Sequence, residues 1–312
     1  MKWMHLPEMD HRGIRALASA ATTALLQVCS LVASLDASAL TSQTISFAAL
    51  SGKSFDAAPF AISATASSGL AVGFISLTPS ICTVAITTVT IQGAGICTIQ
   101  ALQAGDAIYT AAPTVNQTFT VAKAAQTITF AALAGKTYGA APFAISAAAS
   151  SRLMVTFVST TTAVCTATGA MVTIITGGSC TIQAQQAGNG NYYAAANANQ
   201  TFAVAKAAQT ITFAALAGKT YGNSPFTVSA TASSGLAVTF ASTTTTVCTV
   251  NGSTVTIRAG GTCTLQAAQA GNVSYSAAPV VSRSFTVNMG AIVQYTYDSA
   301  GNVIKIERAR PP

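Results

Sequence analysis

Residues 246–257, TVCTVNGSTVTI, decide the fold of this chain because they hold two alternating runs around a tight turn. Apolar and polar residues alternate on both sides of Asn251-Gly252, and this dipeptide between alternating runs predicts a β-hairpin. Similar short runs, separated by turns rich in Gly, Pro and Asn, extend from residue 209 to residue 287. They predict seven short strands, the pattern of an antiparallel β-sandwich.

The same pattern occurs three times at a fixed spacing of 83 residues. The run that begins at Gln43 returns at Gln126 and Gln209 (126 − 43 = 83 and 209 − 126 = 83). A fixed period without insertions indicates several copies of one structural unit. We therefore expect an all-β chain of three tandem antiparallel sandwiches: repeat 1 (42–124), repeat 2 (125–207) and repeat 3 (208–289).

Six of the seven cysteines form pairs at the same position of each repeat: Cys82 with Cys97, Cys165 with Cys180, and Cys248 with Cys263. In an exported domain this pattern predicts disulfides, here between strands separated by one intervening strand. Closing a loop of about 15 residues stabilises a domain by roughly 3 kcal/mol on the chain-entropy model. Two thiolates without other recurring ligands do not complete the four-coordinate site that zinc requires. The sequence also lacks the C-x-x-C motif that is typical of redox catalysis.

The first 39 residues have the features of an export signal. Basic residues precede an uncharged stretch over 16–35, and the following Ala-Ser-Ala predicts cleavage after Ala39. Initiation at Met9 would give a shorter leader. An uncleaved anchor is the alternative, since the stretch is long enough to cross a bilayer although several of its residues are polar. A lipid anchor on Cys29 is disfavoured because Val28, which precedes it, is not a small residue.

The charged residues argue against catalysis. After cleavage the chain would keep eleven basic and four acidic residues, a net charge of +7 (11 − 4), and no histidine. It therefore lacks the usual base of a nucleophilic mechanism, and repeats 2 and 3 contain no carboxylates for paired-acid chemistry or calcium binding. The basic residues are dispersed, unlike a nucleic-acid interface. We expect a non-enzyme without metal or cofactor, without a nucleic-acid partner, and with membrane contact only through its export signal.

A tyrosine recurs in one loop of each repeat, at Tyr109, Tyr192 and Tyr275. One interpretation makes these rings an exposed row of ligand contacts. The other, which we favour, places each ring over the end of its own core with the hydroxyl on the backbone.

The pattern as a whole resembles bacterial immunoglobulin-like domains. Its elements are Q-T-I-T-F-x-A-L-A-G-K-T-Y-G, V-C-T-V-x-G-x-T-V-T-I and G-T-C-T-L-Q-A, and they cover residues 42–288. Such domains form tandem arrays in secreted or surface-exposed bacterial proteins. The resemblance implies immunoglobulin-like sandwiches that serve as spacer, stalk or adhesion modules without catalytic residues. Repeat 1 departs from the pattern at Phe55-Asp56 and at Gly73.

The C-terminal tail, residues 290–312, is not a copy of the unit. Residues 295–304, YTYDSAGNVI, resemble a YD repeat of the Rhs type. One copy cannot close the shell that many such repeats build. The tail is therefore either a vestige of a longer gene or a hairpin that docks on repeat 3 or on another chain.

Three functions remain open on the sequence alone. The leading one is a non-catalytic structural spacer or display stalk, secreted or held at the cell surface, in the periplasm or outside the cell. The second is an adhesin whose loops bind a glycan or a cell-surface protein. The third is a fragment of an Rhs-type surface or toxin-delivery protein. The sequence does not set the oligomeric state.

Overall fold

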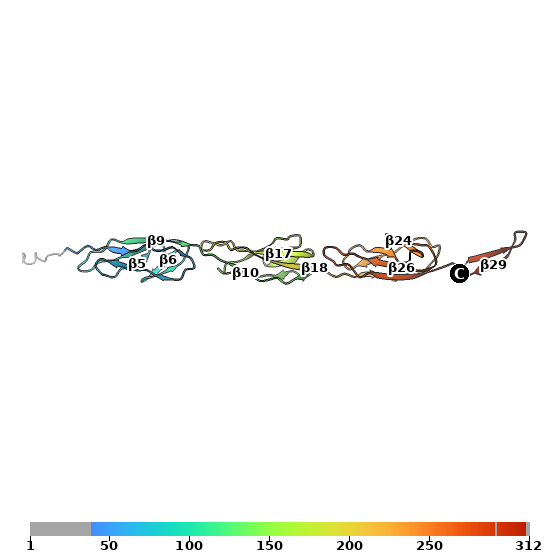
Figure 1. Ribbon diagram of the computed structural model, residues 1–312, viewed down its shortest axis with the longest axis horizontal. Coiled ribbons are helices and arrows are strands. Elements are labelled where there is room, and N and C mark those ends of the chain that lie inside the picture. Colours follow the sequence, from blue (N-terminus) through green and yellow to red (C-terminus); the bar gives the residue numbers. More distant parts are fainter. Residues whose placement is uncertain (1–38, 291, 310–312) are drawn as a thin grey trace, which may run out of the picture. The chain divides into compact units, whose positions relative to one another are not determined.

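The computed structural model describes residues 39–290 and 292–309, which are all-β and contain no helix (Figure 1). The predicted leader, with its cleavage position and Cys29, lies almost wholly outside these residues. The chain forms two compact units that divide between Ala124 and Ala125. Unit 1 contains repeat 1, and unit 2 contains repeats 2 and 3 with the C-terminal tail.

Each repeat contains nine short strands in the same order. In repeat 1 they are β1 (Ile45–Phe47), β2 (Lys53–Ser54), β3 (Phe60–Ala61), β4 (Ala64–Ala66), β5 (Gly73–Ser76), β6 (Cys82–Ala85), β7 (Thr88–Ile91), β8 (Gly95–Leu102) and β9 (Val115–Ala122). In repeat 2 they are β10 (Ile128–Phe130), β11 (Lys136–Thr137), β12 (Phe143–Ala144), β13 (Ala147–Ala149), β14 (Thr156–Ser159), β15 (Cys165–Thr168), β16 (Met171–Ile174), β17 (Gly178–Gln185) and β18 (Ala198–Ala205). In repeat 3 they are β19 (Ile211–Phe213), β20 (Lys219–Thr220), β21 (Phe226–Thr227), β22 (Ala230–Ala232), β23 (Thr239–Ser242), β24 (Cys248–Asn251), β25 (Thr254–Ile257), β26 (Gly261–Ala268) and β27 (Val281–Asn288).

Each repeat is built from a four-stranded sheet, a three-stranded sheet and a two-stranded pair. In repeat 3 the four-stranded sheet has the order β20-β27-β26-β23, the three-stranded sheet has the order β21-β25-β24, and β19 pairs with β22. Inward residues alternate with outward ones along β26, where Cys263, Leu265 and Ala267 are fully buried. They share one core with Val255 of the three-stranded sheet, so the two sheets pack face to face. This arrangement confirms the predicted all-β sandwich.

Repeat 3 has nine strands, two more than the seven predicted from the sequence, because of two local features. Lys219 and Thr220 form a short strand that pairs in parallel with the end of β27. The segment 226–232 holds two strands in place of one: Phe226 pairs with β25, whereas Ala230 pairs with β19. Paired segments of two or three residues are too short for alternation to reveal them, and here the chain changes its partner strand between them.

The C-terminal tail forms one hairpin of β28 (Ile292–Tyr297) and β29 (Val303–Ala309). Its turn is held by Asp298, whose carboxylate accepts backbone N–H groups of Ala300 and Asn302 at 2.9 and 2.8 Å. These and a side-chain bond from Asn302 lower the pKa of Asp298. Tyr295, Ile304 and Ile306 are exposed. The resemblance of this hairpin to a YD repeat stays a prediction.

Candidate functional site: the end loops and the junction of repeats 2 and 3

The three predicted disulfides are present: Cys82–Cys97, Cys165–Cys180 and Cys248–Cys263. In repeat 3 the bridge joins β24 of the three-stranded sheet to β26 of the four-stranded sheet, across the intervening β25. All six cysteines are fully buried, which favours a structural role over thiol exchange. In residues 39–290 and 292–309, no three His, Cys, Asp or Glu side chains are grouped so that they could hold a metal.

The recurring tyrosines lie in a loop at one end of each repeat, which we call the end loop: residues 105–110, 188–193 and 271–276. In repeat 3 the Asn272 side-chain oxygen accepts the backbone N–H groups of Ser274 and Tyr275, both at 2.8 Å. Asp106 does the same in repeat 1 for Ile108 and Tyr109, also at 2.8 Å. The bond from Tyr109 and then that from Ile108 lower the pKa of Asp106. An Asn or Asp at this position therefore sets the loop conformation.

A buried glutamine at the start of each repeat holds the end loop in place. The amide NH₂ of Gln209 donates to the side-chain oxygen of Gln269 at 2.6 Å and to the carbonyl oxygen of Ser276 at 2.7 Å. The Ser234 hydroxyl donates to its amide oxygen, and Gln209 is only 3% exposed. We call this arrangement the glutamine clamp. Gln43 and Gln126 make the equivalent bonds in repeats 1 and 2.

Within unit 2, the end loop of repeat 3 packs against repeat 2. The Tyr275 ring meets Tyr138 of repeat 2 edge-on, with ring centroids 5.3 Å apart. Beside it, the Ser274 hydroxyl accepts a long hydrogen bond from the backbone N–H of Gly177 at 3.4 Å, and Ser274 is 5% exposed. The backbone of the loop is held separately by Ala207, which donates to Ser274 at 2.8 Å and accepts from Ser276 at 2.9 Å, as Thr41 does for the loop of repeat 1. The contacts with repeat 2 are therefore those of the Tyr275 ring and the Ser274 hydroxyl. The loop is thus a docking element between successive repeats.

Close approach at this junction requires a glycine. A Cβ atom added to Gly177 would lie 2.3 Å from the carbonyl oxygen of Val273. No real Cβ contact is that short, and the obstacle is backbone, so a side chain at this position would separate the two surfaces.

Tyr275 therefore has a role that neither sequence interpretation contained. For Tyr275 we expected a cap on its own core, but its ring packs on the neighbouring repeat. Tyr109 and Tyr192 are half-buried in their end loops. A lysine also recurs in each repeat and forms a cation–π contact with a phenylalanine of the same repeat. The Lys219 ammonium lies 4.7 Å from the centre of the Phe226 ring, and Lys53 and Lys136 lie in the same way over Phe60 and Phe143.

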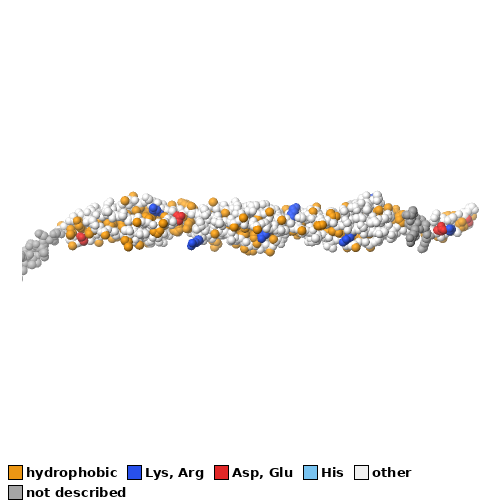
Figure 2. Space-filling model, turned by 60° about the horizontal axis from the view of Figure 1, so that its bottom comes forward, with side chains coloured by type: hydrophobic (Ala, Val, Ile, Leu, Met, Phe, Trp, Pro, Cys, Tyr) orange, Lys and Arg blue, Asp and Glu red, His pale blue; other side chains and the backbone are white. Residues whose placement is uncertain are grey.

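The charged groups in the described part of the chain are occupied in local structure or dispersed. Asp106 and Asp298 form turns, Asp56 accepts the Ser54 hydroxyl at 2.5 Å, and Glu307 pairs with Lys305 at 2.5 Å. Basic side chains stand singly on the face shown in Figure 2. The paired Lys305 and Glu307 side chains both lie exposed on the C-terminal hairpin.

A search of the family models and one of the curated proteins each gave no match. Among solved structures, Drosophila N-cadherin EC1-4 aligns at 11% identity and a TM-score of 0.26, over 80% of this chain and 73% of that one. Domains 1–6 of the surface layer protein SbsC align at 14% and 0.23, over 85% and 44%. The human desmocollin-1 ectodomain aligns at 6% and 0.29, over 83% and 65%. Likenesses this low carry no argument about function. In the described residues, no helix is long and apolar enough to cross a membrane.

Proposed function

We propose that this chain is a non-catalytic exported protein that serves as a spacer or display stalk at the cell surface or in the extracellular space. The proposal rests on one observation: the side chains that recur in every repeat serve structural contacts. In each repeat they form a disulfide, the glutamine clamp and an end loop, and in unit 2 that loop contacts the neighbouring repeat. The repeated unit is therefore a stabilised domain with a loop that can contact the adjacent repeat.

The disulfides support the proposed location. Such bridges persist in oxidising compartments and are rare in the cytosol, which supports a periplasmic or extracellular site. The predicted leader, cleaved after Ala39, would supply the route. As a spacer the chain needs no small-molecule ligand, and the proposal assigns it neither a cofactor nor catalytic residues.

Stretching single molecules of the exported chain tests the proposal. A tether made of three stapled units should unfold in three separate events. Each bridge joins cysteines 15 positions apart and keeps the segment between them from extending, so reduction should lengthen each event by about 50 Å at roughly 3.5 Å per residue. One merged event, or lengths unchanged by reductant, would contradict a stalk of stapled units.

An array of glycans and surface proteins separates the spacer from an adhesin. The exported chain should bind nothing reproducibly, and Tyr109→Ala should behave as the parent does. Binding that this substitution abolishes would replace the spacer with an adhesin acting through the end loop of repeat 1.

A further inference from the structure

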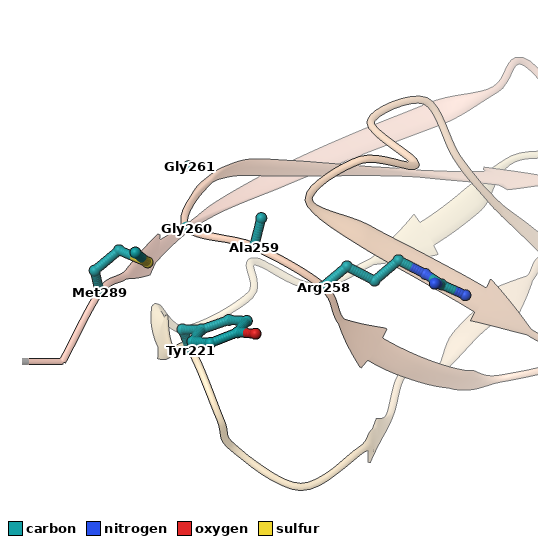
Figure 3. A pocket seen from close by; sticks show the side chains of 6 residues that line it. All are labelled: Tyr221, Arg258, Ala259, Gly260, Gly261 and Met289. Atoms are coloured by element: carbon teal, nitrogen blue, oxygen red, sulfur yellow. The ribbon is translucent and has the colours of Figure 1, made fainter. Parts of the chain in front are cut away.

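The surface of repeat 2 that receives an end loop has an open counterpart on repeat 3. In repeat 2 this surface contains Tyr138 and Gly177. Adding 83 to each number gives Tyr221 and Gly260. These residues line a hollow of about 580 Å³ at the end of repeat 3, which we call the acceptor face: Tyr221, Arg258, Ala259, Gly260, Gly261 and Met289 (Figure 3).

The acceptor face keeps the close-approach glycine. A Cβ added to Gly260 would meet chiefly the Met289 side chain, 2.6 Å from its Cγ atom, where the equivalent Cβ on Gly177 would meet the backbone of a docked loop. Figure 3 shows the Met289 side chain turned toward Gly260. Methionine is flexible and half of this one is exposed, so it can move aside and pack against an incoming loop.

The end loop of repeat 1 has the matching shape. Asp106 holds it through the same two backbone bonds that Asn272 makes in the docked loop of repeat 3. Its backbone pairing is already complete, because Thr41 donates to Ile108 at 2.8 Å and accepts from Thr110 at 2.9 Å. Yet Ile108 is 63% exposed, whereas Ser274 at the equivalent docked position is 5% exposed.

These two surfaces also differ from the internal junction in ways that complement each other. The loop of repeat 1 carries Asp106 where repeats 2 and 3 carry asparagine, and the acceptor face carries Arg258 where repeats 1 and 2 carry Gln92 and Ile175. Their opposite charges would favour encounter. Apolar residues likewise replace polar ones on both sides: Ile108 for Asn191 and Ser274, and Met289 for Lys123 and Lys206.

We propose that copies of this chain associate end to end, with the repeat 1 end loop of one copy docked on the acceptor face of the next. Because donor and acceptor are different surfaces, the contact is heterologous and can propagate into an open chain of molecules. The junction inside unit 2 is helped by its covalent linker, which supplies an effective concentration in the millimolar range. For the internal junction to stay closed, its dissociation constant must lie below that effective concentration, so the same contact without a linker should form at concentrations up to about 1 mM.

Sedimentation velocity of the exported chain over this concentration range tests the proposal. The parent should form species of increasing size, more readily at low salt than at high salt. Gly260→Val should weaken association at least about tenfold, a change of 1.4 kcal/mol. It should leave repeat 3 folded, because Gly260 lies outside the left-handed region and the added Cβ meets chiefly the flexible Met289 side chain, with the Val287 carbonyl oxygen at an ordinary contact distance of 3.5 Å.

The donor side has a matched pair of variants. Ile108→Asp should abolish association, whereas Ile96→Asp, equally exposed at 63% in the same repeat but outside the end loop, should not. Circular dichroism and thermal unfolding establish that each variant is folded.

A mixture of Gly260→Val and Ile108→Asp gives the decisive result. One variant keeps only its donor and the other only its acceptor, so the mixture should form heterodimers and nothing larger. A parent that stays monomeric to 1 mM would overturn the proposal, as would association that survives Gly260→Val or a mixture that forms no dimer. None of these outcomes bears on whether the chain is a spacer, which the stretching experiment decides.

Discussion

Replacing Ile86 with glycine should stabilise repeat 1. Ile86 occupies the turn between β6 and β7 with φ +56°, in the left-handed region that β-branched residues avoid. Repeats 2 and 3 have Gly169 and Gly252 at this position, with φ of +57° and +58°. The left-handed conformation costs a residue with a Cβ roughly 1–2 kcal/mol.

The net gain is smaller than this strain. Glycine has more backbone freedom in the unfolded chain, which offsets roughly 0.5–1 kcal/mol. Ile86 is 90% exposed, so its removal loses almost no buried apolar area. We expect Ile86→Gly to raise the free energy of unfolding of repeat 1 by about 0.5–1 kcal/mol, which corresponds to a Tm increase of about 2–8 °C for a domain of this size.

Hydrogen exchange read by mass spectrometry on peptides from residues 82–91 assigns the effect to repeat 1, and calorimetry gives its size. Gly252→Ile is the reverse substitution and should lower the Tm of repeat 3 by a similar amount. If Ile86→Gly lowers the stability of repeat 1 and Gly252→Ile leaves that of repeat 3 unchanged, the left-handed backbone at Ile86 does not strain the turn.

Two further predictions concern the residues that hold the end loops. Gln209→Leu removes three hydrogen bonds, two of them with the half-buried side chains of Gln269 and Ser234, so repeat 3 should lose about 2–4 kcal/mol in denaturant unfolding. Thr212→Ala, on the exposed side of β19, should change the free energy of unfolding of repeat 3 by no more than about 0.5 kcal/mol. Equal losses in the two variants would show that the glutamine clamp does not stabilise the repeat. The lowered pKa of Asp106 means that it stabilises the folded state above its unfolded pKa, near 3.8, and that this contribution disappears as the pH falls through its folded pKa. The acid loss of stability in repeat 1 should therefore be smaller in Asp106→Asn, whose amide oxygen keeps the loop bonds, and identical acid profiles would contradict this.

The sequence predicted correctly those features that depend on residues near one another in the chain. Asn251-Gly252 predicted the β24–β25 hairpin, and the spacing of Cys248 and Cys263 predicted a bridge between non-adjacent strands. Both depend on residues close together in the chain, whose period and spacing can be read directly.

The glutamine clamp was missed although its residues recur with the 83-residue period. Gln209 and its partner Gln269 are 60 residues apart, and nothing in either local sequence indicates that they meet. The contact of Tyr275 with Tyr138 depends further on how one repeat is placed after another. Repetition indicated that these positions matter, but only the three-dimensional arrangement shows that they join repeats.

In unit 2 an end loop fixes repeat 3 on repeat 2. Residual dipolar couplings of these two repeats in the intact chain measure this, with Gly177→Val as the perturbation, since the added side chain would collide with the Val273 carbonyl. We expect one alignment tensor to fit both repeats in the parent, and the variant to require two tensors while each repeat stays folded. Two independent tensors in the parent would contradict it.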